Sequence, residues 1–200
     1  MLARSAQLPV LDGVVDLPPG KIAAIATYLE MVQRPERPAR PLPGRLERLS
    51  RDLARYRSLY GRIGEPWLWF SRAVMPDERL RGIIGDPAVE AWVLVVDGRD
   101  VGLAELDFRR PNECEISFFG LVPESCGIGL GPALMDEALR RSFARAPRVW
   151  LHTCTLDHPA AVPFYLKAGF RPFRRAIEVA DDPRLTGHMP RHAAPMFPTL

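Results

Sequence analysis

The chain has 200 residues, of which 47% are hydrophobic and 26% are charged, a composition typical of a folded globular protein. Its longest apolar runs are about five residues, whereas a membrane-spanning helix needs about 20, and the N-terminal stretch contains no apolar signal core. The formal net charge of +3 is too small to require a nucleic-acid partner. We therefore expect a single cytoplasmic domain over residues 1–200, with no membrane or nucleic-acid partner.

The net positive charge is concentrated in the N-terminal third of the chain. Residues 20–32 fit either a strand or a buried helix, and residues 34–44 must form a loop because they hold four prolines. Residues 45–60 carry leucines and tyrosines at steps of three and four between arginines, which predicts an amphipathic helix. Residues 34–62 contain nine arginines and three acidic residues, so this segment either steers an acidic binding partner or solubilises the helix.

The middle of the chain reads as a connector, a helix and three strands. Residues 66–70 are rich in aromatic side chains, and a short helix is predicted between Pro76 and Gly85. Asp97-Gly98 is a strong hairpin signal. The three strands of the resulting antiparallel meander are residues 89–96, 101–108 and 114–122.

The C-terminal half alternates helices and strands. A glycine-rich turn leads into a helix that ends near residue 144, and a second helix, residues 159–168, is closed by Gly169. Strands are predicted at residues 148–155 and 173–179, followed by an irregular extension over residues 181–200 that covers the domain or hangs free. This order of elements predicts an α+β, or mixed α/β, fold.

The glycine-rich turn is the first candidate for a binding site. It reads Gly127-Ile128-Gly129-Leu130-Gly131 and opens directly into the predicted helix. Glycines let the backbone approach a ligand, and the free amides at a helix start attract an anion such as a pyrophosphate. Because the preceding strand belongs to a meander, a Rossmann site is not expected, and the alternatives are an anion-binding loop or a plain tight turn.

Two motifs together resemble the Gcn5-related N-acetyltransferase (GNAT) family. That family carries an Asn-x-x-Ala-x-x-x-Tyr-x-x-x-Gly-Phe pattern, which this chain matches at Ala161, Tyr165, Gly169 and Phe170, with His158 in place of Asn. Its other pattern, (Arg/Gln)-x-x-Gly-x-(Gly/Ala), reads Cys126-Gly127-Ile128-Gly129-Leu130-Gly131 here. The resemblance is firm over residues 89–179.

The resemblance implies a central, mostly antiparallel twisted sheet with a splayed strand pair, flanked by helices. It also implies an acetyl-CoA-dependent N-acetyltransferase in which a primary amine attacks directly in a ternary complex. The alternative is a non-catalytic module that senses acyl-CoA. The acceptor would be a small-molecule or peptide amine, and a homodimer is a further expectation because family members often dimerise.

In the family, acetyl-CoA lies where the fourth and fifth strands separate. The pantetheine would pair with strand backbone, and the pyrophosphate would sit on amides of the glycine turn and the helix start. The residues implied in cofactor binding are Leu121, Val122, Gly127, Ile128, Gly129, Leu130, Gly131, Pro132 and His158. His158 alternatively serves as a helix cap.

Candidate catalytic residues also follow from the resemblance. Tyr165 matches the tyrosine that protonates the departing CoA thiolate, although it also fits a core aromatic position. Glu115 matches a strand glutamate used as the base, and Glu105 on the preceding strand is its rival; either also fits a half-exposed strand position.

The aromatic connector is the predicted acceptor wall, and no metal is expected. Trp67, Trp69 and Phe70 would suit an aliphatic amine or its ammonium form, or they would simply pack in the core. The three cysteines have neither zinc-site spacing nor an even number, so we expect free thiols and no metal.

Overall fold

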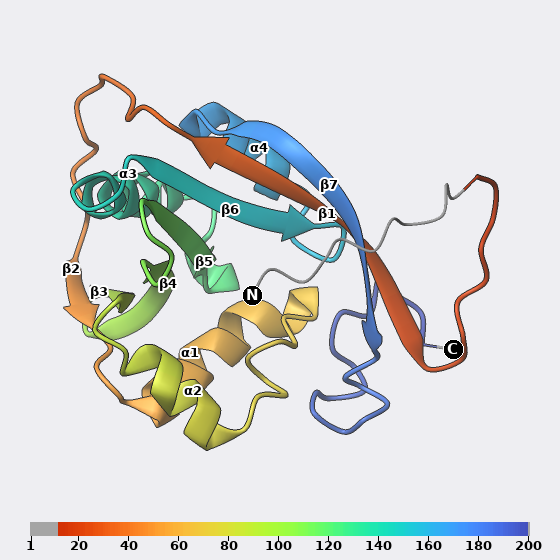
Figure 1. Cartoon of the computed structure of the whole chain (residues 1–200). Coiled ribbons are helices and arrows are strands. Elements are labelled where there is room, and N and C mark those ends of the chain that lie inside the picture. The colour runs from red at the N-terminus through yellow and green to blue at the C-terminus, as the bar shows by residue number, and fades with distance from the viewer. Residues whose placement is uncertain (1–11, 200) are drawn as a thin grey trace.

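A computed structural model describes residues 12–199 (Figure 1). The N-terminal residues 1–11, on which the prediction about a signal segment rests, lie outside the described part. The strands are β1 Lys21–Met31, β2 Arg45–Arg48, β3 Val89–Val96, β4 Arg99–Asp107, β5 Glu113–Leu121, β6 Arg148–Cys154 and β7 Arg171–Asp181. The helices are α1 Leu53–Gly64, α2 Asp77–Ile84, α3 Leu130–Phe143 and α4 Ala161–Ala168, with short 3-10 turns at Glu65–Trp67 and Pro123–Ser125.

All seven strands form one sheet in the order β2-β3-β4-β5-β6-β1-β7. Each neighbouring pair is antiparallel except β5 and β6, which are parallel. Consecutive side chains of β5 point to opposite faces: Phe118 packs against Tyr60 of α1, and Phe119 packs against Phe164 of α4. The predicted fold class, a mixed α/β fold with a mostly antiparallel sheet flanked by helices, is confirmed.

The β3–β4 hairpin forms at the dipeptide that predicted it. Asp97 and Gly98 both have positive φ angles, 49° and 74°. Two positive φ angles in a two-residue loop match the twist of antiparallel strands, and glycine adopts such a conformation without strain.

The helix predicted over residues 45–60 is wrong in its first half. Residues Arg45–Arg48 form strand β2, which pairs with β3, and the helix begins only at Leu53. Asp52 sets that start, because its side chain accepts a hydrogen bond from the amide of Arg55. The leucine spacing is the same whether residues 45–48 form a helix or a strand. Their pairing with the buried strand β3 therefore decided that they form a strand.

The N-terminal segment, left open between strand and helix, is the long strand β1. It lies between β6 and β7 and pairs antiparallel with both. Its alternate residues are buried, as in Ala24 and Ala26, because one face lies against the protein interior. The first and last parts of the chain therefore share one end of the sheet (Figure 1).

The parallel pair β5–β6 separates after a short ladder. Pairing covers only Glu113–Glu115 with Arg148–Trp150, although both strands continue beyond it. The register between β4 and β5 shifts here, so that Ser117 is an extra residue on β5. A bulge of this kind bends its strand, which explains why β5 turns away from β6. The predicted splayed pair is present, and it leaves a gap in the sheet between β5 and β6.

Candidate active site

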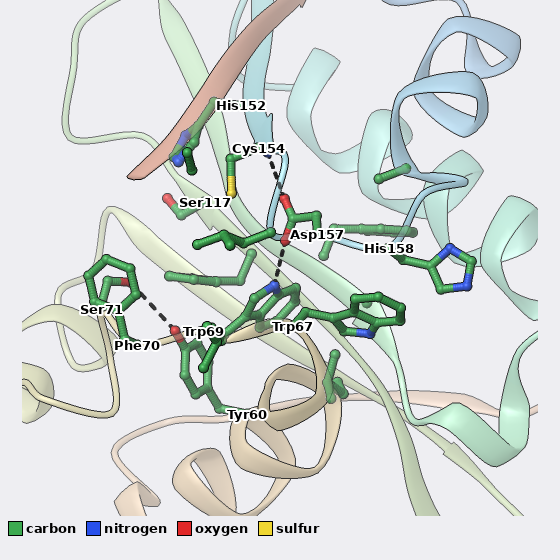
Figure 2. Close-up of a pocket in the computed structure, with 18 of the residues that line it drawn as sticks. Tyr60, Trp67, Trp69, Phe70, Ser71, Ser117, His152, Cys154, Asp157 and His158 are labelled. Carbon is green, nitrogen blue, oxygen red and sulfur yellow. Dashed lines mark hydrogen bonds between the residues drawn. The ribbon is translucent and has the colours of Figure 1, made fainter. Parts of the chain in front are cut away.

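A cavity of about 370 Å³ occupies the space between the separated strands (Figure 2). One side is β5 from Ile116 to Leu121, and the other includes His152 and Cys154 of β6. The remaining walls come from two groups of segments. The first is α1 and the connector after it, with Tyr60, Ile63, Trp67, Leu68, Trp69, Phe70 and Ser71. The second is the β6–α4 loop, α4, β1 and β7, with Leu156, Asp157, His158, Ala161, Tyr165, Ile22, Ala24, Glu178 and Ala180.

The glycine turn forms the exposed rim next to the cavity. Gly127 and Gly129 have φ angles of +81° and +90°, and no atom lies within 4 Å of the position of a Cβ at either. Among the described residues no side chain caps the N-terminus of α3, where Gly129 is the N-cap. The first backbone amides of this 14-residue helix therefore have no side-chain partner. They face outward and can donate hydrogen bonds to an anion.

The remaining predicted cofactor residues differ in what they offer. Ile128 is exposed and Leu121 lines the cavity, whereas the amide of Val122 already donates to the carbonyl of Val101 at 2.9 Å. Pro132 has no amide hydrogen and cannot donate one. The usable donors of the turn are thus the amides of residues 127–131.

Tyr165 lies on α4 and faces the cavity. Only 8% of its surface is exposed, and burial raises the pKa of its phenol above the ordinary value. Its ring packs edge-on against Phe119 and Phe170. The residue therefore occupies a core aromatic position and also lines the cavity.

His158 has a structural role in this state. Its Nδ1 accepts a hydrogen bond from the amide of Ala160 at 3.0 Å, just before α4, and its ring lies edge-on to Trp67. The helix-cap role left open in the sequence analysis is not observed, because the N-cap of α4 is Ala160 and, among the described residues, no side chain caps that helix. The ring of His158 also lines the cavity.

The aromatic connector lines the cavity and is fixed by a residue that the sequence did not single out. The Trp69 indole donates to Asp157 at 2.8 Å (Figure 2). The other carboxylate oxygen of Asp157 accepts from the Thr153 hydroxyl and from the amide of Cys154. Asp157 therefore joins the connector to the β6–α4 loop across the cavity. Trp67 and Phe70 lie on the same wall.

Two glycines make room for the Trp69 ring. A Cβ on Gly64 would lie 2.3 Å from the Cβ of Trp69, and one on Gly120 would lie 2.5 Å from Ile63 and 3.0 Å from the Trp69 ring. Neither glycine has a positive φ, so space and not backbone conformation requires them. Their roles depend on contacts between distant segments, which no local pattern reveals.

Glu105 lies outside the cavity, and both of its carboxylate oxygens accept hydrogen bonds. It is completely buried, and its two oxygens bind the Tyr56 hydroxyl and the Arg72 guanidinium, both at 2.5 Å. A buried carboxylate needs such partners, because an unpaired charge in the interior is costly.

Glu115 also lies outside the cavity, in a neighbouring hollow of about 240 Å³ that it shares with Asp107 and Trp150. Burial, reinforced by the charge of Asp107, raises the pKa of its carboxyl to about 7. The strand rise places it about 13 Å along β5 from Phe119, which contacts Tyr165. Any proton exchange between Glu115 and the cavity therefore needs intervening water.

The C-terminal extension supports the far wall of the cavity. Arg184 and Asp182 form a buried ion pair, and Arg184 also donates to the carbonyl of Phe197 at 2.7 Å. This fixes Met189, Ala193 and Ala194 in a small apolar cluster with Leu68 and Leu156, which line the cavity. Of the two predictions for this segment, covering the domain is the one observed.

The arginine-rich segment is largely paired within the protein. Arg37 and Arg40 bind Asp136 of α3, and Arg55 binds Asp100. Arg62 binds Glu124, close to the glycine turn. The local excess of arginine in the sequence thus supplies ion pairs that join this segment to α3 and to the β3–β4 region.

Within the described residues, His, Cys, Asp and Glu side chains form no group of three that could hold a metal ion. No helix there is long and apolar enough to cross a membrane. The thiol of Cys154 lines the cavity, and burial raises its pKa to about 11, so it is protonated at neutral pH.

Comparison with protein families decides the family. The model described as the acetyltransferase (GNAT) family matches residues 53–170, more than half of the chain. The protein belongs to the GNAT family. The predicted resemblance is thereby confirmed, and membership supports acetyl transfer as the general activity and an N-acetyltransferase at the level of the family. Curated proteins gave no match.

Solved structures share the fold. An acetyltransferase of the GNAT family from Novosphingobium aromaticivorans has a TM-score of 0.56 at 22% identity, over 82% of this chain and 68% of that one. A conserved protein of unknown function from Staphylococcus epidermidis has a TM-score of 0.60 at 17% identity, over 82% of this chain and 64% of that one. The PaiA N-acetyltransferase of Thermoplasma acidophilum, in complex with coenzyme A, has a TM-score of 0.51 at 19% identity, over 68% of this chain and 98% of that one. The chain thus spans about two thirds of the first two proteins.

Proposed function

We propose that this protein is an acetyl-CoA-dependent N-acetyltransferase that acts on a primary amine by direct attack in a ternary complex. The observation that carries the proposal is the cavity between β5 and β6. It reaches Cys126, next to the glycine turn, where no side chain among the described residues caps α3, and Tyr165 also lines it. This arrangement supports an anion site at the turn and a proton donor at Tyr165 on one cavity.

The residues present fit acetyl-CoA as the co-substrate. The amides of residues 127–131 would hold the pyrophosphate, since helix starts favour negative charge. The edge of β5 beyond Glu115 has no partner in β6, so Leu121 and its neighbours can pair with an amide-containing arm. Bound there, acetyl-CoA supplies the acetyl group as a thioester.

We assign the acid role to Tyr165. When the amine nitrogen bonds to the acetyl carbon, the carbon–sulfur bond breaks, and the Tyr165 hydroxyl donates its proton to the sulfur. A phenol in a buried, apolar site stays protonated, which its raised pKa supports. General acid catalysis of this kind contributes about 10²- to 10⁴-fold in rate.

We assign the base role to Glu115, acting through water. An alkylammonium with a pKa near 10.4 must lose a proton before it can attack. A carboxyl with a pKa of about 7 suits a base that works near neutral pH. Glu105 is the weaker candidate because both of its oxygens are bound by Tyr56 and Arg72, and we assign it a structural role.

The acceptor wall favours a small amine with an apolar body. Trp67, Trp69 and Phe70 provide aromatic surface, which attracts both alkyl groups and ammonium ions. Two carboxylates line the same cavity, and Asp157 is already bound to Trp69, so Glu178 is the one left for a cation. A peptide amine remains the alternative acceptor.

A thiol-release assay tests the function. The purified protein is incubated with acetyl-CoA and a panel of alkylamines, arylalkylamines, polyhydroxylated amines and short peptides, and each product is weighed by mass spectrometry. We expect thiol release coupled to a product heavier by one acetyl group, with apolar amines preferred. Tight acetyl-CoA binding without acetylation of any amine would favour a sensing module.

A further inference from the structure

His152 of β6 brings an imidazole to the wall of the cavity. Its side chain is exposed, and it lies at the same end of the cavity as Ser117 of β5 and Cys154 of its own strand (Figure 2). Imidazole is the side chain that most readily takes up and releases a proton near neutral pH. A proton acceptor thus lines the cavity itself, whereas Glu115 lies outside it.

The other three histidines of the chain have contacts that the His152 ring does not share. In each of them a ring nitrogen meets a neighbouring group: His158 with the amide of Ala160, His188 with the Thr186 hydroxyl and His192 with Glu65. The His152 ring instead stacks on the ring of Tyr28, with the centroids 5.4 Å apart. This contact uses the aromatic ring of Tyr28 and not its hydroxyl. Stacking covers a face of the imidazole and leaves the edge, which carries both nitrogens, for the cavity.

His152 lies between the cavity and Glu115. Side chains two residues apart on a strand point to the same face, so Trp150, His152 and Cys154 form one row on β6. Trp150 is the register partner of Glu115 and shares its hollow, whereas His152 and Cys154 line the cavity. The strand rise therefore places His152 about 7 Å along β6 from the level of Glu115.

The separation of β5 and β6 leaves room for water between these two side chains. The parallel ladder ends at the pair Glu115–Trp150, so no strand pairing closes the space beyond it. Ser117, the extra residue of the β5 bulge, adds a hydroxyl on the opposite wall. Hydroxyl groups and water both donate and accept hydrogen bonds, so together they can carry a proton across this space.

We propose that His152 takes the proton from the acceptor ammonium and passes it through water to Glu115. This inference rests on the proposed function and adds a second catalytic residue on the base side of the same reaction. Glu115 keeps its role as the base that acts through water, and His152 is the group that meets the amine.

The proton transfers balance over the whole reaction. One N–H bond of the ammonium breaks as the neutral imidazole gains that proton, and the freed lone pair of the nitrogen attacks the acetyl carbon. The imidazolium then gives a proton to water, and the Glu115 carboxylate receives one from the same chain of hydrogen bonds. A second proton leaves the nitrogen as the amide forms, and it replaces the one that Tyr165 gave to the sulfur.

His152→Ala, assayed with two acceptors, tests the role of the imidazole. With the best amine of the panel, kcat/KM should fall about 100-fold, while calorimetric titration finds the affinity for acetyl-CoA unchanged. With 2,2,2-trifluoroethylamine, which is already a free base at neutral pH, the loss should nearly vanish because no proton has to be removed before attack. His188→Ala is the matched control, since His188 is exposed on the C-terminal extension and does not line the cavity.

The double variant H152A/E115Q tests the transfer to Glu115. If the two residues handle one proton in series, the double variant should lose about as much kcat/KM as His152→Ala alone. Independent contributions would instead multiply.

Each outcome supports or overturns the relay. Wild-type kcat/KM in His152→Ala, or an equal loss with both amines, would overturn the role of His152. Losses that multiply in the double variant would overturn the transfer to Glu115. Circular dichroism of every variant separates loss of activity from loss of the fold. A wild-type protein that acetylates no amine would overturn the proposed function itself, and that result is obtained before any variant is compared.

Discussion

The two ends of the cavity are built by different means. At the glycine turn, one continuous segment supplies backbone amides, and the two positive-φ glycines hold them outward. At the acceptor end, side chains from the connector, the β6–α4 loop and the C-terminal extension meet through Trp69, Asp157 and Leu156. The first end depends on local conformation, and the second depends on tertiary contacts.

The two ends of the cavity should respond differently to mutation. A backbone site tolerates changes of side chain but not of conformation, so a glycine-to-alanine change should harm it. A side-chain site can change its ligand by exchanging a few residues while the fold is kept. We therefore expect cofactor binding and acceptor binding to be separable by mutation, and four substitutions test this.

The largest effect is expected from Tyr165→Phe, which acts at the junction of the two ends. It removes the only proton that the phenol can give to the thiolate, so kcat should fall about 100-fold while the affinity for acetyl-CoA is kept. Steady-state thiol release with the best amine of the panel measures this.

Tyr28→Phe is the matched control for that variant. Tyr28 lies outside the cavity, where it stacks on Trp150, and its variant should keep the wild-type kcat. If Tyr165→Phe also keeps it, Tyr165 has no part in the reaction.

Gly129→Ala should weaken acetyl-CoA binding about tenfold. Alanine at a φ of +90° costs about 1–2 kcal/mol, and relaxation of that strain turns the amides away from the ligand. Gly98→Ala carries similar strain at a distant hairpin, where φ is +74°. Calorimetric titration should find both variants less stable but only Gly129→Ala impaired in binding; equal affinities would argue against an anion site at the turn.

Trp69→Phe should raise the KM of the acceptor about fivefold and leave acetyl-CoA binding unchanged. The change removes the hydrogen bond to Asp157, a loss of about 1 kcal/mol, while most of the aromatic surface stays. Trp92→Phe is the control, because that indole binds Glu90 outside the cavity. If Trp69→Phe weakened acetyl-CoA binding more than it raised the KM of the amine, the claim that the two binding functions can be separated by mutation would be contradicted.

Glu115→Gln should change how the stability of the protein depends on pH. The folded-state pKa of about 7 lies above the ordinary 4.5, so the folded protein binds the proton more tightly. The free energy of unfolding should therefore decrease by about 2–3 kcal/mol as pH rises from 4.5 to 7, and the variant should lack this decrease. Urea titrations at several pH values measure it.

The same variant tests the base in the kinetics. If Glu115 takes the proton from the amine, the wild-type kcat/KM rises with pH through about 7, and Glu115→Gln loses that step. An unchanged acidic limb would assign the base elsewhere.

Local patterns predicted the parts of the molecule that are built locally. Asp97-Gly98 predicted the hairpin, and the glycine turn with the Tyr165 motif predicted the family. The cofactor site at the glycine turn stays a prediction. Residues 45–48 show the limit, because their helical spacing was overridden by pairing with β3. A pattern within one segment cannot state which partner that segment will find.

The acceptor end was only partly predictable for the same reason. Trp67, Trp69 and Phe70 could be named because aromatic residues cluster in sequence, and all three line the cavity. Asp157 and the Arg184–Asp182 pair were missed, since their roles arise from contacts between segments far apart in the chain. The room that Gly64 makes for Trp69 likewise depends on a tertiary contact.

Hydrogen exchange with and without acetyl-CoA tests the central claim most directly, because it reports on individual stretches of backbone. We predict that acetyl-CoA slows exchange at the amides of residues 127–131 and along the edge of β5, and leaves the C-terminal extension unchanged. Protection of the extension or of the connector, with none at the glycine turn, would contradict a cofactor site built from the backbone of that turn.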